Sequence, residues 1–233
     1  MWDELQACLP KDSAEQFSAG QYAAKLAPSL PKGALVLDLG CGSGVSVDLF
    51  RRIAPQVKWL GVDIEDSPEA VARTRKDAEF RYYNGIDIPV APDSIDMIYS
   101  RQVFEHVRYP ESVLADIGRV LKPGGVFIGS TSHLEPYHSF SFWNYTPFGF
   151  KRLIDAASGL ELVEMRPGID SVTLINRAYR NNDPEMNHWF GEESPMNREI
   201  DEWAKMGGHS VQEAAYRKLA FCGQFAFWVR KQG

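Results

Sequence analysis

The sequence has no run of lysine and arginine and no long hydrophobic stretch. Its 233 residues contain 25 Lys and Arg against 31 Asp and Glu, which gives a formal net charge of −6. Without a basic stripe, the chain lacks the electrostatic footprint of a nucleic-acid-binding protein. No apolar segment approaches the roughly 20 residues that a membrane-spanning helix needs. We therefore expect no nucleic-acid partner and no membrane insertion.

Cysteine is also scarce. Cys8, Cys41 and Cys222 are scattered and form no CxxC pair, so neither a disulfide framework nor a cysteine-ligated zinc site is expected. The N-terminal segment "MWDELQACLPKDSAEQF" carries acidic residues and no apolar core, unlike a signal peptide. Reduced thiols and the absence of a leader pattern predict a cytoplasmic protein.

Apolar segments of strand type alternate with segments of helical periodicity. Hydrophobic residues make up 44% of the chain, enough for a sizeable core. The predicted strands cover 34–39, 57–63, 79–84, 94–100, 125–131, 160–168 and 222–231, and the predicted helices between them cover 45–54, 68–78, 110–121 and 146–159. Such alternation is typical of a mostly parallel sheet with helices on both faces, a doubly wound α/β fold.

Two segments depart from simple alternation, within what we expect to be a single domain over 1–233. Residues 1–30 are predicted to form one or two amphipathic helices ahead of the first strand. Residues 171–218 are predicted to be helical and are long for a connection between strands. Two interpretations of 171–218 remain: a helical excursion on the surface, or a cap over a binding site.

The stretch "VLDLGCGSG" places Gly40, Gly42 and Gly44 between the first predicted strand and the following helix. In doubly wound sheets, ligands bind at this end of the strands, where glycines allow close approach of the backbone. Asp63 ends the next strand, and an acid there can accept hydrogen bonds from both ribose hydroxyls. This pattern predicts a nucleoside site. The spacing is GxGxG, with Val45 where the dinucleotide fingerprint GxGxxG has its third glycine.

Four segments in register carry a resemblance to a known family. They read "VLDLGCGSG", "GVDIEDSP", "YYNGIDIPVAPDSIDMIYSRQVFEHV" and "ADIGRVLKPGGVFIGST", in this order over most of 34–131. The sequence resembles the class I S-adenosylmethionine-dependent methyltransferases, in the branch that acts on small molecules. The resemblance implies a Rossmann-like sheet of seven strands, with 222–230 antiparallel to 160–167. It also implies S-adenosyl-L-methionine as cofactor and S-adenosyl-L-homocysteine as product.

The resemblance assigns cofactor contacts position by position. Asp38 and the glycine turn are expected to face the methionine part of the cofactor, Asp63 its ribose, and Ile64 its adenine. Asn84 stands where the family usually has an acid that contacts the adenine amino group. The complete set of expected cofactor contacts is Asp38, Gly40, Cys41, Gly42, Gly44, Asp63, Ile64, Asn84, Gly85, Ile86, Ser100, Arg101 and Gln102.

The catalytic candidates follow the fifth strand. An acceptor hydroxyl benefits from a general base, and His133, Glu135 and His138 are the candidates, of which we choose His133 because it is nearest to the strand end. His106, Trp143 and Tyr145 are the candidates for acceptor contacts. Each of these residues has an alternative interpretation as a loop or packing residue. Glu105, Glu135, His133 and His138 could in principle bind a divalent ion, but no spacing demands a metal, and none is expected.

A weaker resemblance extends over 133–164, to methyltransferases of bacterial polysaccharide and lipopolysaccharide gene sets. It favours O-methylation of a sugar or glycan precursor as the function, with a small-molecule acceptor as the only expected partner. N- or C-methylation of another metabolite is the alternative within the enzyme class. A nicotinamide-dependent oxidoreductase and a non-catalytic cofactor-binding protein are the alternatives outside it. The sequence does not indicate the oligomeric state.

Overall fold

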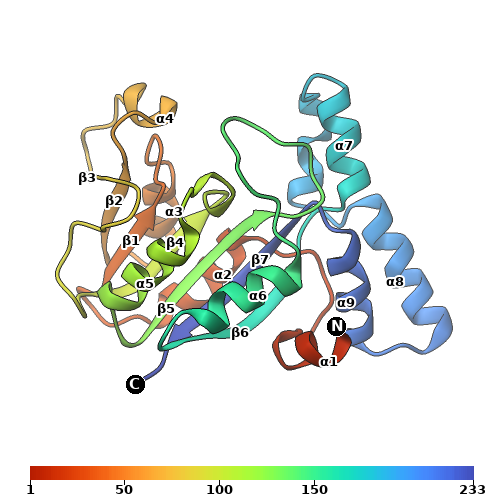
Figure 1. Ribbon diagram of the computed structural model, residues 1–233. Helices are drawn as coiled ribbons and strands as arrows, with labels where there is room; N and C mark the ends of the chain where they lie inside the picture. The colour runs from red at the N-terminus through yellow and green to blue at the C-terminus, as the bar shows by residue number, and fades with distance from the viewer.

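The computed structural model describes residues 1–233 and contains one seven-stranded sheet (Figure 1). The strand order is β3-β2-β1-β4-β5-β7-β6, and only β7 runs antiparallel to its neighbours β5 and β6. The bounds are β1 Leu35–Leu39, β2 Lys58–Ile64, β3 Glu79–Tyr83, β4 Ile95–Arg101, β5 Leu121–Ser132, β6 Leu160–Pro167 and β7 Gln224–Lys231. The predicted Rossmann-like sheet with an antiparallel last strand is confirmed.

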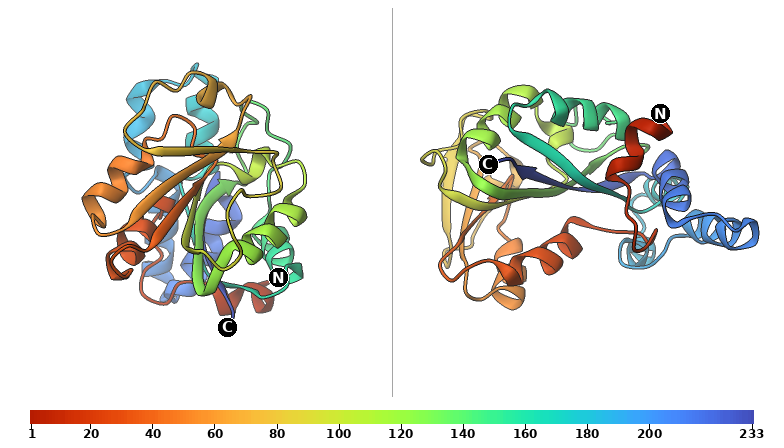
Figure 2. Two further views of the ribbon diagram at one scale, coloured as in Figure 1. Left: turned by 90° about the vertical axis from the view of Figure 1, so that its left-hand side faces the viewer. Right: turned by 90° about the horizontal axis from the view of Figure 1, so that it is seen from below.

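Helices cover both faces of the sheet (Figure 2). The bounds of the helices are α1 Trp2–Leu5, α2 Ala19–Leu26, α3 Ser46–Ile53, α4 Pro68–Val71, α5 Pro110–Val120, α6 Pro147–Ala156, α7 Ser171–Tyr179, α8 Pro195–Gly207 and α9 Val211–Phe221. Short 3₁₀ turns are η1 Gln6–Cys8, η2 Ala27–Ser29, η3 Phe104–His106 and η4 Pro184–Phe190. None of these helices combines the length and the hydropathy needed to cross a bilayer.

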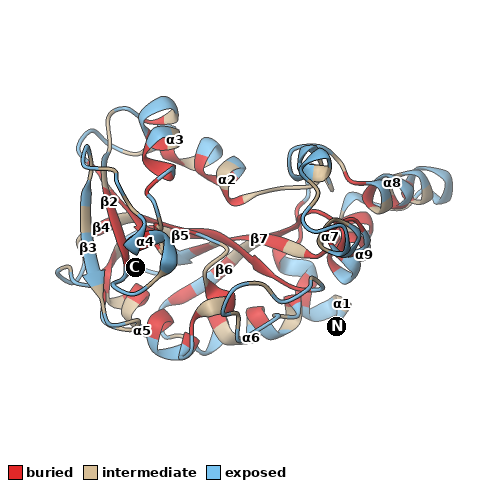
Figure 3. Cartoon of the chain, turned by 90° about the horizontal axis from the view of Figure 1, so that it is seen from above, coloured by how far each residue is buried: buried red, intermediate tan, exposed pale blue.

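The core has two parts because side chains of a strand alternate between the faces of the sheet. Along β1, Leu37 joins a cluster of 28 buried residues that includes those of α5 and α6. Its neighbour Val36 joins a second cluster of 11 buried residues, formed with α2 and α3. Figure 3 shows the buried strands lying between these two helical layers. Both faces are therefore apolar, which explains why the strands read as nearly continuous hydrophobic runs.

The helix predicted over 68–78 is wrong in extent, because α4 is a single turn that ends at Val71. The residues that follow are mainly charged, and Val71 itself is 73% exposed, so no apolar face exists to hold a longer helix on the sheet. Arg73 instead donates from Nε to the carbonyl of Gly42 at 2.8 Å, and Arg75 pairs with Asp48 at 2.5 Å. The segment is held by polar contacts rather than by helix packing.

The N-terminal region 1–30 contains only one helix of two turns. This helix is α2, which begins at a capping box in which Ser18 and Gln21 satisfy each other's backbone N–H groups. α1 has four residues and is followed by η1 and an extended segment that includes Pro10. The expectation of amphipathic helices is thus met by α2 and by a single turn at α1.

Residues 171–221 form the helices α7, α8 and α9 at the β6 end of the sheet (Figure 1). A buried lysine joins the parts of this region: Lys218 of α9 is fully buried and its Nζ contacts Glu193 at 2.5 Å and Asp201 at 2.7 Å. Asn197 of α8 donates to the carbonyl of Gly168 at 3.0 Å and to Gln16. These buried polar contacts fix the α8–α9 part of the region to the sheet and to the N-terminal segment.

Candidate active site

The turn between β1 and α3 forms the floor of the candidate site. Gly40, Gly42 and Gly44 have φ angles of 72°, 51° and 81°, a region in which residues with a Cβ are strained. A Cβ on Gly40 would collide with Val103, and one on Gly44 would lie 2.7 Å from the Phe80 ring. The backbone N–H groups of Gly40 and Cys41 donate to the carbonyl of Val62. The turn therefore needs glycine both for its conformation and for its packing.

Asp38 is a buried acid at the end of β1, 4% exposed. It accepts a short hydrogen bond from the hydroxyl of Ser46, and the indole of Trp59 donates to the same hydroxyl at 3.0 Å. Burial raises the pKa of Asp38 to about 7, since the Ser46 hydrogen bond only partly offsets it and the charge of Asp63 adds to it. This carboxyl changes charge near neutral pH unless a cation is placed against it.

Asp63 is buried at the end of β2 and supports the glycine turn. Its Oδ2 accepts from the backbone N–H of Gly42 at 2.6 Å, and its Oδ1 accepts from the N–H of Ile64 at 2.8 Å. Each carboxylate oxygen keeps a second lone pair for a ligand. Ile64 is 37% exposed beside it. Cys41 is buried, and burial raises the pKa of its thiol, with Asp38 and Asp63 adding to the effect.

The residues after β3 form a tight turn. The side-chain oxygen of Asn84 accepts from the backbone N–H groups of Ile86 at 2.9 Å and Asp87 at 2.8 Å, and its amide donates to the Asp87 carboxylate. Gly85 has a φ of 85° in this turn. Both lone pairs of the Asn84 oxygen are therefore used inside the turn, and the expected contact to an adenine amino group would need this turn to open.

Unpaired polar atoms gather at the end of β4. Ser100 is 1% exposed and its hydroxyl has no partner. The side-chain oxygen of Gln102 also has no partner, although its amide donates to the Ser130 hydroxyl at 2.9 Å. Gln102 has a φ of 53°, unusual for a residue with a side chain. Orphaned buried groups and backbone strain are found together at ligand sites.

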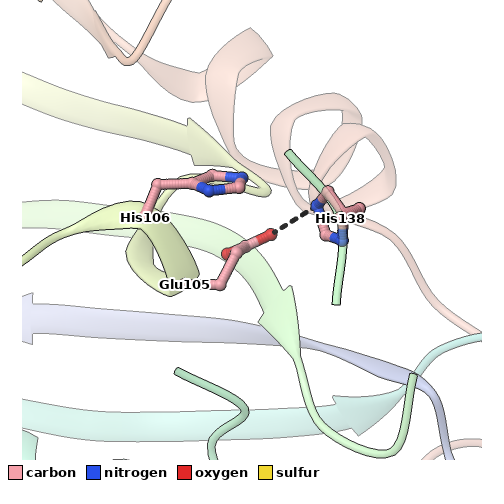
Figure 4. Close-up of side chains that lie close together, drawn as sticks. All are labelled: Glu105, His106 and His138. Atoms are coloured by element: carbon pink, nitrogen blue, oxygen red, sulfur yellow. Dashed lines mark ion pairs between the residues drawn. The ribbon is translucent and has the colours of Figure 1, made fainter. Parts of the chain in front are cut away.

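Three titratable side chains converge beyond β4 (Figure 4). Glu105 and His106 lie in η3, and His138 comes from the segment after β5. The Nε2 of His138 lies 3.7 Å from Oε1 of Glu105, and the His106 and His138 rings meet edge to face with centroids 5.1 Å apart. Glu105 is fully buried, and burial raises its pKa to about 7. Burial also lowers the pKa of His106, and His138 contributes to this decrease.

Two of the expected acceptor residues hold the segment after β5 in place. The indole of Trp143 donates to the carbonyl of Val107 at 2.8 Å, and the hydroxyl of Tyr145 donates to the carbonyl of Phe104 at 3.2 Å. Trp143 keeps 44% of its surface exposed, whereas Tyr145 is packed against the core and contacts Phe150 edge to face. These contacts fasten 140–145 onto η3, and of the two residues only Trp143 keeps an exposed face.

Glu135 and His133 differ in their hydrogen bonds to other side chains. The carboxylate of Glu135 accepts a short hydrogen bond from Ser132 and another from Gln224 at 2.9 Å, and burial raises its pKa. His133 is 8% exposed, and burial lowers its pKa, with the backbone of Tyr145 acting in the opposite direction. An imidazole with a lowered pKa is neutral at pH 7 and able to accept a proton.

Sequence reasoning missed several residues that build the site. Ser46 and Trp59 hold Asp38, and nothing in their sequence context distinguishes them from ordinary helix and strand residues. Gly61 also escaped notice, although a Cβ there would meet Trp59 at 2.5 Å and the Cys41 sulfur at 2.7 Å. Glu105 carried a signal as the one acid in the segment 103–107, but its burial and its contact with His138 could not be read from the sequence.

The residues present fit the predicted cofactor. A glycine turn, two buried carboxylates and two unpaired side-chain oxygens lie at the carboxyl ends of neighbouring strands β1, β2 and β4. Ligands of doubly wound sheets bind at this edge, and a buried carboxylate there can receive the positively charged amino group of a nucleoside-bearing ligand. The predicted cofactor contacts at the ends of β1, β2 and β4 lie at this edge of the sheet, whereas the Asn84 side chain is bonded within the turn after β3. The candidates after β5 divide into His138, which contacts Glu105, and His133, which lies against the Tyr145 backbone.

The methyltransferase-domain family model matches residues 15–185, which is more than half of the chain. A probable S-adenosylmethionine-dependent methyltransferase of Mycolicibacterium smegmatis is 32% identical over 130 residues, 55% of this chain and 49% of its own. A ubiquinone biosynthesis O-methyltransferase of Nitrosococcus oceani is 34% identical over 110 residues, 45% of this chain and 46% of its own. The chain thus spans about half the length of these curated relatives.

Solved structures show the same fold at low sequence identity. A putative methyltransferase of Haloferax volcanii, solved in complex with the Trm112 methyltransferase activator, superposes with a TM-score of 0.59 at 20% identity, covering 92% of this chain and 89% of its own. A geranyl diphosphate methyltransferase in complex with SAM gives 0.55 at 15% identity, covering 92% and 84%. With the family match, the predicted fold and cofactor are confirmed, and the chain belongs to the class I S-adenosylmethionine-dependent methyltransferases.

Proposed function

We propose that the chain transfers a methyl group from S-adenosylmethionine to a hydroxyl oxygen on a ring-bearing small molecule. When bound, the cofactor supplies an electrophilic methyl group on a sulfonium sulfur. The proposal rests on one observation. The glycine turn and the aromatic and titratable residues of 133–146 lie at the same edge of the sheet. The chain's task is then to align donor and acceptor and to exclude water.

The cofactor contacts follow from the buried polar groups. Asp38 receives the ammonium group of the methionine tail, and Asp63 receives the ribose hydroxyls. Ile64 offers an apolar surface beside them. Ser100 and Gln102 have unpaired oxygens, and a ligand with N–H or O–H donors satisfies them. Asp38 and Asp63 are already buried and held by hydrogen bonds, so little conformational freedom is lost when these two groups bind.

Exposed aromatic side chains favour an acceptor with a ring. Tyr137, Phe140, Phe142 and Trp143 are 86%, 74%, 56% and 44% exposed within one segment. Aromatic faces stack on the apolar faces of sugars and on aromatic rings. A sugar or glycan-precursor hydroxyl is the first candidate, from the resemblance over 133–164. A hydroxyl on an aromatic ring is the second, because curated relatives are named O-methyltransferases of ubiquinone biosynthesis.

His133 is the proposed general base. Its pKa is lowered by burial, so the imidazole is neutral at pH 7 and can take the hydroxyl proton as the methyl group transfers. Glu135 is already engaged by Ser132 and Gln224, and His138 faces Glu105. His133 is therefore the candidate among the three whose side chain is not committed to another side chain.

An acceptor panel with labelled cofactor tests the proposal. We expect label to reach either a nucleotide sugar or a phenolic compound, and the methylated oxygen to be identified by mass spectrometry. Transfer to an amine or carbon acceptor alone would replace O-methylation by the alternative within the enzyme class. Tight binding of S-adenosylhomocysteine without transfer to any acceptor would favour a non-catalytic cofactor-binding protein.

The raised pKa of Asp38 predicts pH-dependent cofactor binding. The ammonium of the ligand needs the carboxylate form, so affinity for S-adenosylhomocysteine should rise as pH increases through about 7 and then level off. Below that pKa the affinity should fall by up to about tenfold per pH unit. Calorimetric titration between roughly pH 6 and 8 measures this. Asp38→Asn should bind more weakly and lose this dependence, and an unchanged pH profile in this variant would contradict the assignment.

The region 171–218 is proposed as a cap, with its two ends in different roles. Lys218 and Asn197 anchor the α8–α9 part, whereas α7 exposes Val172, Ile175 and Tyr179. Amide hydrogen exchange should become slower in α7 and η4 when acceptor and S-adenosylhomocysteine bind together, and less so with the cofactor product alone. The α8 and α9 amides serve as the internal control. Full protection of α7 in the free chain would make this region rigid scaffold.

A further inference from the structure

We propose that Glu105, His106 and His138 form a binding site for a divalent transition-metal ion of the Zn²⁺ type, with a free position directed toward the acceptor. The role of the ion in acceptor binding rests on the proposed function, whereas the binding of the ion does not. The three side chains come from two separate segments, η3 and the segment after β5, and point toward one another (Figure 4). The sequence spacing gave no sign of this site, because His138 lies far along the chain from the adjacent pair.

The distances match a ligand set that needs little adjustment. The ligating atoms of the three residues all lie within 4.8 Å of one another, and Oε1 of Glu105 lies 3.7 Å from Nε2 of His138. Zinc–nitrogen and zinc–oxygen bonds of about 2.0–2.2 Å place two ligand atoms about 3.4 Å apart at the tetrahedral angle. A separation of 3.7 Å is too long for a hydrogen bond. It agrees with two atoms that share one ion.

One oxygen of the buried Glu105 carboxylate has no hydrogen-bond partner. Glu105 is fully buried; Oε2 accepts from the Thr131 hydroxyl at 2.9 Å, whereas Oε1 makes no hydrogen bond. An unpaired buried carboxylate oxygen is costly. No lysine or arginine forms an ion pair with Glu105; the one such pair involves His138, which carries a charge only when protonated. A bound cation at this position compensates the buried charge and uses the free oxygen.

The two segments that carry the ligands are joined by hydrogen bonds before any ion binds. The backbone N–H groups of Phe142 and Trp143 donate to the carbonyl of Glu105 at 2.7 and 3.1 Å. The side chains of Trp143 and Tyr145 add the bonds to the Val107 and Phe104 carbonyls described above. This clamp fixes 140–145 against η3 and so holds the neighbouring segment that carries His138 beside Glu105 and His106. Preorganised ligands lose little conformational freedom when they bind a metal.

The donor types select the class of ion. Two imidazoles and one carboxylate suit Zn²⁺ and other first-row divalent ions, whereas Mg²⁺ and Ca²⁺ prefer oxygen donors. Three protein ligands leave at least one coordination position free, as in catalytic rather than structural zinc sites. His138 is 41% exposed at its side chain, so this position is reachable from solvent. An acceptor hydroxyl coordinated there would become more acidic, which eases the loss of its proton during methyl transfer.

Zinc binding to the full chain, freed of metal by a chelator, tests the proposal in the absence of cofactor and acceptor. Calorimetry should show one Zn²⁺ per chain. Glu105→Gln and His138→Ala should each weaken binding at least about tenfold, since even indirect partners of metal ligands cost 10–100-fold. His188→Ala is the matched control, because this exposed ring contacts only the Glu185 carbonyl and the adjacent Trp189. Co²⁺ serves as a second probe, with visible absorption bands that appear at one equivalent and that Zn²⁺ abolishes.

The outcomes separate this proposal from the proposed function. If Zn²⁺ does not bind, or if Glu105→Gln and His138→Ala bind it as tightly as the His188→Ala control, the site is overturned whether or not the chain methylates a hydroxyl. Retained binding of S-adenosylhomocysteine by Glu105→Gln shows that the variant is folded. Equal turnover of the zinc-free and zinc-loaded chains would overturn the role of the ion in acceptor binding. One-to-one binding that Glu105→Gln and His138→Ala weaken, and His188→Ala does not, supports the site even if no acceptor is found.

Discussion

Replacing His133 by alanine is expected to lower the rate of methyl transfer to a hydroxyl acceptor about 100-fold or more, the usual contribution of a general base. The imidazole directly follows β5, and its burial favours the neutral form that accepts a proton. Cofactor binding should be nearly unchanged, because the predicted cofactor contacts lie after β1, β2, β3 and β4. Single-turnover kinetics with labelled cofactor, alongside calorimetry with S-adenosylhomocysteine, measures the two effects separately.

The pH profile distinguishes a base from a merely structural histidine. In the unaltered chain the rate should fall as pH decreases through the His133 pKa, which lies below the ordinary value for histidine. His133→Ala should lose this limb, and His133→Gln, which keeps a polar side chain, should lack it as well. If His133→Ala keeps near-full turnover while Glu135→Ala or His138→Ala collapses, the base is one of those residues, and for His138 the binding of Zn²⁺ by the variant separates this role from metal ligation. If all three variants stay active, the acceptor is an amine or an activated carbon.

Replacing Asp63 by alanine is expected to weaken the binding of S-adenosylhomocysteine at least tenfold. The variant loses two charge-assisted hydrogen bonds to the ribose, each worth about 1.5–3 kcal/mol, and about 1.4 kcal/mol already corresponds to tenfold. The second lone pair of each Asp63 oxygen is available for these bonds. Calorimetric titration gives the affinity, and the thermal unfolding midpoint shows whether the fold survives.

Asp63 also supports the glycine turn, so a control is needed. Its Oδ2 accepts from the N–H of Gly42, and alanine leaves that donor unpaired. Asp63→Asn keeps a side-chain oxygen for Gly42 but removes the charge and one acceptor. We expect this variant to bind between the unaltered chain and Asp63→Ala. Equal affinity in all three proteins would refute the ribose assignment.

The strands could be predicted because both faces of the sheet are buried. Leu37 and Val36 enter different core clusters, so β1 reads as an apolar run that is interrupted only by Asp38 and ends at the glycines. The antiparallel position of β7 came from the family resemblance, since an apolar strand carries no signal of direction. The prediction of a helix over 68–78 was wrong in extent because the pattern of alternating strands and helices favoured it, although the residues after Val71 offer no apolar face. In the folded chain, Arg73 and Arg75 hold that segment through polar contacts with residues distant in sequence.

The sequence by itself determined the fold class and predicted a nucleoside site at one edge of the sheet, and its family resemblance supplied the cofactor. The fold class and the nucleoside site depend on local patterns: glycines at fixed spacing, an acid at a strand end, and alternating strands and helices. Only the tertiary structure decided which polar groups are buried, paired or left free. Ser46 reaches Asp38, and His138 reaches Glu105 and His106, through contacts between segments far apart in the chain. Burial and distance in space arise from packing of the whole fold, and no local pattern records them.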